Sequence, residues 1–141
     1  MRYEVSAQIA VEYIKRFIGL PYKWGGDDPM EGFDCSGLAN EMLKSVGHME
    51  NDSDDTADGL MRRFPKVEKP VVGCLAFFGR QERATHIGIC LNAVEMLEAG
   101  GGGSKTNDLD DAKEQNAFIR MRPISNRKDF ICFNDPFSGE P

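Results

Sequence analysis

Cys35 is the residue of this chain whose position most favours nucleophilic chemistry. The apolar residues after it recur at helical spacing, which predicts an amphipathic helix over residues 35–46 that begins at the cysteine. Asp34 is the predicted N-cap of this helix, and Gly47 is the predicted stop. The unpaired N–H groups and the dipole of a helix N-terminus favour a thiolate over a thiol. A small buried cysteine after an ordinary cap explains the same residues equally well.

His86 is the candidate base that would activate such a cysteine. In the predicted strand over residues 85–91, alternation places His86 and Gly88 on one face. The glycine beside the imidazole leaves room for another element, and if the helix of Cys35 packs there, ring and thiol meet. A half-buried histidine with a backbone partner is the alternative. The second histidine, His48, follows the helix end and is expected in a solvated loop.

Glu98 is the candidate third member of this group. In the predicted strand over residues 94–99, it shares a face with Val94 and Met96. A carboxylate on an apolar face is costly unless it meets a donor or a cation, and an imidazolium on the neighbouring strand would supply one. Such a carboxylate would hold the ring in its productive orientation. A side chain that points to a sheet edge is the alternative.

The elements that must position these residues follow an α+β pattern. We expect a single domain over residues 1–141, with helices first and strands afterwards, and therefore a largely antiparallel sheet. In the first helix the predicted core stripe is Ile9, Ala10, Tyr13, Ile14 and Phe17. After Pro70 only strands are expected. The predicted helices cover residues 6–18, 35–46 and 56–64, and the predicted strands cover residues 71–78, 85–91, 94–99, 117–122 and 129–133.

Composition excludes several classes of partner. A formal net charge of -6 without a basic stripe argues against nucleic acid. No apolar run approaches the roughly 18 residues of a membrane span, and the N-terminal residues do not follow a signal-peptide pattern, so synthesis in the cytoplasm is expected. Four widely spaced cysteines without a Cys-x-x-Cys pair disfavour zinc. We expect free thiols, with Cys74, Cys90 and Cys132 packed in strands.

Two other motifs resemble ligand-binding loops only in part. Residues 99–106 differ from a phosphate-binding loop at both required glycines, which are replaced by Ala99 and Ser104. A turn bordering the cleft is the preferred interpretation. Residues 54–59 resemble a calcium loop, but Pro65 stands where the chelating glutamate would be, so a solvated acidic loop is expected. No cofactor and no metal are predicted.

Four segments together resemble the NlpC-type cell-wall cysteine peptidases, a branch of the papain-like fold. They occur in the family's order within residues 17–105 and are GLPYKWGG at 19–26, GFDCSGL at 32–38, GCLAFF at 73–78 and THIGI at 85–89. The resemblance implies N-terminal helices packed on a mainly antiparallel five- to six-stranded sheet. One departure is Cys74, which replaces a common aspartate and is read as outside the chemistry.

The resemblance also implies roles for individual residues. Cys35 would be the nucleophile and His86 the general base, while Tyr22 and Ser36 would contact the substrate or the oxyanion. Glu98 occupies the third polar position, where the family commonly has histidine.

The implied activity is cleavage of amide bonds in peptidoglycan stem peptides through an acyl-enzyme. A phage or prophage enzyme that acts on the wall after delivery is favoured over one that recycles wall peptides inside the cell. A catalytically inactive wall-peptide-binding module of a phage tail is the alternative.

Overall fold

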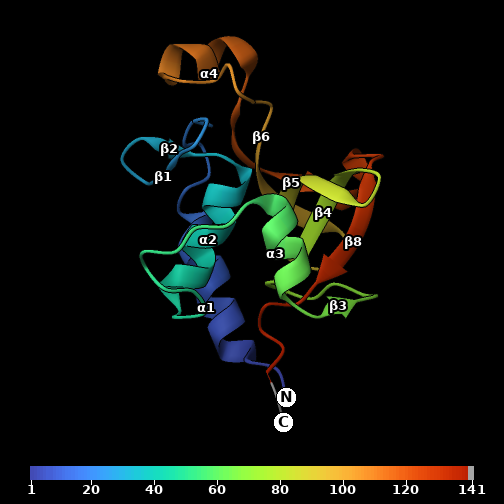
Figure 1. Ribbon diagram of the computed structural model, residues 1–141. Coiled ribbons are helices and arrows are strands. Elements are labelled where there is room, and N and C mark those ends of the chain that lie inside the picture. Colours follow the sequence, from blue (N-terminus) through green and yellow to red (C-terminus); the bar gives the residue numbers. More distant parts are fainter. Residues whose placement is uncertain (140–141) are drawn as a thin grey trace.

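The computed structural model describes residues 1–139 (Figure 1). Its α-helices are α1 (Glu4–Lys15), α2 (Cys35–Ser45), α3 (Ala57–Arg63) and α4 (Leu109–Gln115). Its strands are β1 (Asp27–Asp28), β2 (Gly32–Phe33), β3 (Lys66–Val67), β4 (Leu75–Arg80), β5 (Arg83–Cys90), β6 (Glu95–Gly100), β7 (Phe118–Pro123) and β8 (Phe130–Asn134). None of the helices within residues 1–139 has the length and apolar character needed to cross a membrane.

A six-stranded sheet forms the centre of the fold, in the order β3-β8-β4-β5-β6-β7. Every neighbouring pair in it is antiparallel. The prediction of an α+β fold with a five- to six-stranded antiparallel sheet is therefore confirmed. A separate ribbon of β1 and β2 lies beside the N-terminal end of α2, with α4 beyond it (Figure 1).

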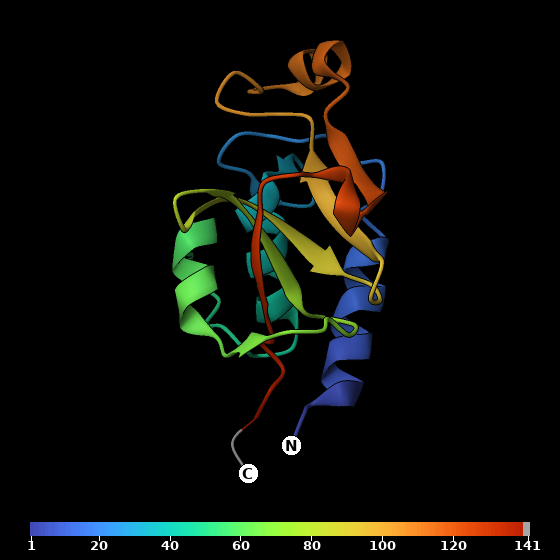
Figure 2. The ribbon, with the colours of Figure 1, turned by 90° about the vertical axis from the view of Figure 1, so that its right-hand side faces the viewer.

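The sheet buries a different set of side chains on each face. The larger cluster joins α1, α2 and α3 to the face that carries Ile87, Ile89 and Leu97. Figure 2 shows α2 behind the strands on this side. The smaller cluster covers the opposite face and contains Cys74, Ala76, Phe78, Cys90, Met96 and Ile124. Burial of apolar area on both faces fixes the sheet against the helices.

The helix of Cys35 begins and ends close to the predicted residues. The carboxylate of Asp34 caps α2 by accepting a hydrogen bond from the N–H of Gly37 at 2.7 Å. At the other end Gly47 has a φ of 76°, a left-handed conformation that glycine adopts without strain. The stripe after Cys35 is buried as predicted, and it includes Leu38, Ala39, Met42 and Leu43.

The predicted core stripe of the first helix is confirmed for Ala10, Ile14 and Phe17, which are buried, and wrong for Ile9. Ala7, Ala10, Val11 and Ile14 are the buried residues, whereas Ile9 is 59% exposed. Both stripes have helical spacing and share Ala10 and Ile14, so periodicity alone does not decide between them. Small side chains at positions 7 and 10 let α1 approach α2 closely, and packing of this kind decides the face.

The expectation of strands alone after Pro70 is also wrong. The helix α4 interrupts the strands, with Asp108 as its N-cap and Asn116 in the left-handed conformation at its C-cap. Because Ala112 is its one buried residue, α4 shows no apolar stripe that a sequence pattern could detect. Strand β4 starts at Leu75, not at residue 71, because a turn bonds the N–H of Cys74 to the carbonyl of Val71.

Candidate active site

Cys35 is the first residue of α2 and is partly exposed. The carboxylate of Asp34 accepts hydrogen bonds from the N–H groups of Gly37 at 2.7 Å and Gly25 at 3.0 Å, which fix the start of the helix. Burial raises the pKa of Asp34 against the effect of these bonds. The N–H of Cys35 precedes the first intrahelical bond and has no acceptor within the helix. It is therefore free to stabilise negative charge that develops beside the sulfur.

His86 and Glu98 form a buried pair on the strands β5 and β6. Nε2 of His86 lies 3.1 Å from Oε1 of Glu98, and the two residues are 8% and 5% exposed. In the pairing of β5 with β4, His86 is opposite Phe78 and Ala84 is opposite Gly79, so a β-bulge lies directly before the histidine. Bulges of this kind redirect a side chain at the end of a strand.

The charge state of the pair follows from its partners. Burial lowers the pKa of His86, but hydrogen bonding and charge from Cys35 and Glu98 outweigh it and raise the pKa to about 9. Burial raises the pKa of Glu98, but the hydrogen bond and charge of His86 lower it to below its usual value. Both directions favour an imidazolium beside a carboxylate. Because Nε2 is bonded to Glu98, Nδ1 is the ring nitrogen that remains for the thiol of Cys35.

Further side chains support this pair on the face of the sheet that lies opposite α1 and α2. The ring of Phe78 is 5.8 Å from that of His86, and the guanidinium of Arg127 lies 5.3 Å from the centre of the Phe78 ring. The charges of Arg122 and Arg127 help to lower the pKa of Glu98. Within residues 1–139, the second carboxylate oxygen of Glu98 is buried without a hydrogen-bond partner. Positive charge therefore supports this carboxylate in place of a second hydrogen bond.

The predicted packing around Gly88 is wrong. The side chain of Met96 fills the space over Gly88, since an added Cβ there would overlap its sulfur. The apolar stripe of α2 packs instead in the cluster of Ile87 and Ile89, on the opposite face. Hydrogen bonding and charge from Cys35 nevertheless help to raise the pKa of His86, and the ring follows the bulge of β5, a strand that α2 contacts.

Tyr22 is held by two other segments of the chain. Its N–H donates to the carbonyl of Ala117 at 3.0 Å, and the residue forms a parallel bridge with Phe33. Burial, with the charges of Cys35 and Asp34, raises the pKa of Tyr22 above its usual value. The phenol therefore stays protonated and can donate a hydrogen bond near the sulfur.

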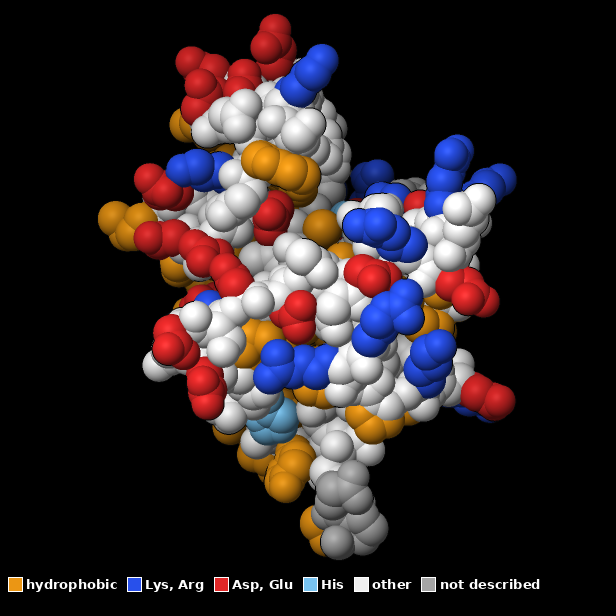
Figure 3. Space-filling model, in the orientation of Figure 1, with side chains coloured by type: hydrophobic (Ala, Val, Ile, Leu, Met, Phe, Trp, Pro, Cys, Tyr) orange, Lys and Arg blue, Asp and Glu red, His pale blue; other side chains and the backbone are white. Residues whose placement is uncertain are grey.

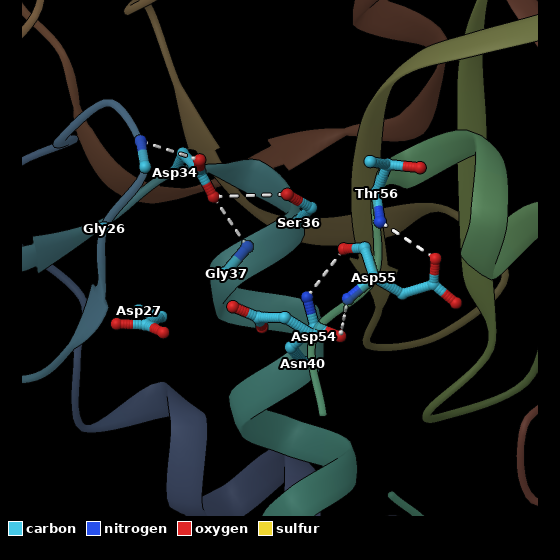
Figure 4. A pocket seen from close by; sticks show the side chains of 10 residues that line it. Gly26, Asp27, Asp34, Ser36, Gly37, Asn40, Asp54, Asp55 and Thr56 are labelled. Atoms are coloured by element: carbon cyan, nitrogen blue, oxygen red, sulfur yellow. Dashed lines mark hydrogen bonds between the residues drawn. The ribbon is translucent and has the colours of Figure 1, made fainter. Parts of the chain in front are cut away.

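Ser36 lines a separate pocket. Its hydroxyl donates to Asp34 at 3.3 Å and faces a cavity of about 280 Å³ beside the first turn of α2 (Figure 4). Asn40, one turn further along α2, and Asp55 and Thr56, from the segment before α3, also line it (Figure 4). Within the described residues, neither Cys35 nor His86 lines this cavity. The cavity therefore adjoins the candidate catalytic residues and does not contain them.

The residues that build this pocket wall were not predicted from the sequence. Asn40 is 2% exposed; its amide donates to the carbonyl of Asp55 at 2.8 Å and accepts from the N–H of Asp55 at 3.2 Å. The acidic segment expected as a solvated loop is therefore fixed to α2. A polar residue on the apolar stripe of α2 was the available signal. Within residues 1–139, no three side chains of the metal-binding types group around a common point.

Known proteins resemble this chain over most of its length. The profile of the NlpC/P60 family matches residues 19–123. The chain is 31% identical over 110 residues to the bifunctional muramidase/DL-endopeptidase CwlT of Bacillus subtilis (strain 168) and 28% identical over 104 residues to the murein DD-endopeptidase MepH of Escherichia coli (strain K12). These matches cover 76% and 71% of this chain. They cover 32% and 38% of the relatives, so the chain spans about a third of their length.

Solved structures share the fold. An NlpC/P60 family protein from Bacillus cereus ATCC 10987 superposes with a TM-score of 0.76 at 20% identity, covering 94% of this chain and 40% of that protein. The NlpC/p60 domain of the peptidoglycan hydrolase SagA gives a TM-score of 0.68 at 20% identity, covering 92% and 97%. The family profile spans the segments that carry Tyr22, Cys35, His86 and Glu98, and on this basis the chain belongs to the NlpC/P60 family.

Proposed function

We propose that this chain is a cysteine hydrolase that cleaves amide bonds within peptidoglycan stem peptides. The relatives named above are endopeptidases of peptidoglycan, or murein, which supports this class of substrate. The observation that carries the mechanism is the buried His86–Glu98 pair, in which Cys35, at the N-terminus of α2, helps to raise the pKa of the histidine. A thiolate beside an imidazolium is the usual form of an activated cysteine nucleophile.

The reaction would begin with attack of the Cys35 thiolate on the carbonyl carbon of the scissile amide. A carbon–sulfur bond forms, and the carbonyl electrons move to oxygen, where the N–H of Cys35 and the hydroxyl of Tyr22 stabilise the charge. The imidazolium of His86 then gives its proton to the amide nitrogen, and the carbon–nitrogen bond breaks. The amine leaves, and an acyl-enzyme remains.

Water completes the cycle with the same residues in reversed roles. His86, now neutral, takes a proton from the water as the water oxygen attacks the thioester carbon. The carbon–sulfur bond breaks, which releases the carboxylic acid and restores the thiolate–imidazolium pair. Glu98 keeps Nε2 of the ring engaged throughout, so that Nδ1 exchanges protons with both amide and water.

The test is digestion of soluble stem-peptide fragments, followed by mass spectrometry of the products. We expect cleavage by the unchanged chain and no cleavage by Cys35→Ala, with the same circular-dichroism spectrum and thermal unfolding midpoint for both proteins. Turnover that persists in the folded Cys35→Ala variant would refute the mechanism. Binding of the fragments by the unchanged chain without any cleavage would support the inactive wall-peptide-binding module instead.

A further inference from the structure

Gly102 lies directly against the ring of Tyr22. A Cβ built on Gly102 would stand 2.5 Å from Cγ of Tyr22 and 2.9 Å from Oγ1 of Thr106. Cγ lies on the axis of the Cβ–Cγ bond, so rotation of the ring about that bond would not move it away. At the next position, Gly103, an added Cβ meets no atom within 4 Å. Position 102 therefore requires glycine, whereas position 103 has room for a side chain.

The segment of Tyr22 has little freedom to move away from Gly102. On one side, the N–H of Lys23 donates to the carbonyl of Phe33 at 3.1 Å, next to the parallel bridge of Tyr22 with Phe33. On the other side, the N–H of Trp24 donates to the carbonyl of Thr106 at 2.7 Å. A methyl group at position 102 would therefore displace the ring or the hydrogen-bonded backbone.

Thr106 ties the glycine segment to α4. It is fully buried, and its hydroxyl accepts the N–H of Gly103 at 3.0 Å and donates to the side chain of Gln115 in α4. Residues 100–106 are thus a fixed wall and not a free loop. The helix α4 buries little apolar surface, but through Gln115 it holds this segment in place.

We propose that Gly102 is a positioning residue, whose missing side chain lets residues 100–106 hold the phenol of Tyr22 at the oxyanion. This inference rests on the proposed function, in which Tyr22 donates to the developing charge. A displaced phenol weakens a hydrogen bond that is made in the transition state. The loss then falls on kcat, while KM is unchanged.

The experiment compares Gly102→Ala with its matched control Gly103→Ala on one soluble stem-peptide substrate. We expect kcat to fall roughly tenfold or more in Gly102→Ala, in line with the loss of an oxyanion donor, and to stay unchanged in Gly103→Ala. The rate of Cys35 alkylation by iodoacetamide should stay unchanged in both variants, because the thiolate–imidazolium pair does not involve this wall. Equal kcat values in the two glycine variants would overturn the inference.

A Tyr22→Phe background separates positioning of the hydroxyl from general damage. Gly102→Ala should cause little further loss of kcat there, because the group on which it acts is absent. Full additivity of the two losses would overturn the inference. If Gly102→Ala does not fold, Thr106→Val is compared in the same way, with Tyr22 present and with Tyr22→Phe. This substitution removes the hydroxyl bonds that hold residues 100–106 without adding bulk. No cleavage by the unchanged chain would refute the proposed function itself, whereas cleavage with additive losses refutes the role of Gly102 alone.

Discussion

Glu98 gives the ring of His86 a charged partner where a neutral acceptor would suffice for orientation. An amide oxygen can hold the Nε2–H in place equally well. The carboxylate adds a full negative charge, which contributes to the rise of the histidine pKa to about 9. The imidazolium then persists to higher pH, but it is a weaker acid toward the leaving amine. Glu98 should therefore widen the active pH range and limit the rate of proton transfer.

Substitution of Glu98 should separate charge from orientation. Glu98→Gln keeps an acceptor for Nε2 and removes the charge, so the alkaline limb of the kcat/KM profile should shift from about pH 9 toward lower pH. Glu98→Ala removes both the charge and the acceptor for Nε2, and it should have a lower kcat than Glu98→Gln because the ring also loses its orientation. His86→Ala removes the proton donor and should cost roughly 10²–10⁴-fold in kcat, more than either glutamate variant. An alkaline limb that stays in place in Glu98→Gln would contradict the assigned role of the charge.

At the scale of elements, the start of α2 carries Cys35, the proposed nucleophile. Asp34 closes the first turn through Gly37, and it also accepts the N–H of Gly25 from the preceding loop. One carboxylate thus joins the helix of Cys35 to the segment that contains Tyr22. The sequence predicted this start because a cap, a cysteine and an apolar stripe are local signals. The pocket wall of Asn40 and Asp55 escaped prediction because it joins two elements through backbone atoms.

The cap of α2 should influence activity as well as stability. Asp34→Ala should lower the free energy of unfolding by about 0.5–2 kcal/mol, and kcat should fall with it because the N–H of Cys35 loses its fixed direction. Asp34→Asn keeps a good cap and should retain most of the stability. Ser45→Ala is the matched control at the other end of α2, where the hydroxyl donates to the carbonyl of Met42 at 2.6 Å. Denaturant unfolding and substrate turnover measure both effects, and a comparable fall of kcat in Ser45→Ala would contradict the local explanation.

At the scale of the whole molecule, charge is distributed unevenly although the net value is -6. Figure 3 shows acidic side chains over α4 and the β1–β2 ribbon, and basic side chains over the opposite lobe of β4, β5 and β8, with a hollow between the lobes. The net charge alone suggested no basic surface, because opposite patches cancel in the sum.

The sequence predicted the direction of side chains within each strand, but it did not predict long-range packing between elements. Alternation grouped His86 with Gly88 on β5 and Glu98 with Met96 on β6, since a strand fixes the direction of its own side chains, but only the pairing of the strands brings the two residues together. Alternation did not show which face receives α2, because Ile87 and Gly88 offer plausible surfaces on both sides. Only the complete set of neighbours, Met96 over Gly88 and the helices over Ile87, decides this point.

The buried pair also makes the stability of the whole fold depend on pH in a defined direction. The pKa of His86 is about 9 in the folded chain against a usual value of 6.5, so its contribution is complete below pH 6.5 and is lost as pH rises through about 9. The pKa of Glu98 is lowered from 4.5, so its contribution is complete above that value and is lost as pH falls through the lowered pKa. Stabilisation by the pair should therefore be greatest between these two limits.

Urea unfolding of the unchanged chain and of His86→Gln tests this dependence. The difference in free energy of unfolding should be largest near about pH 6 and should shrink by about pH 9.5, as the imidazolium of the unchanged chain loses its proton. His48→Gln, which removes the second of the two histidines, gives the correction for the loss of an imidazole as such. A difference that stays constant over this range, after that correction, would mean that the pKa of His86 is the same in the folded and the unfolded chain, and a difference that grows as pH rises would mean that His86 is neutral in the folded chain. The thiolate–imidazolium pair would then form only when substrate binds, and Cys35 would react as a thiol until that moment.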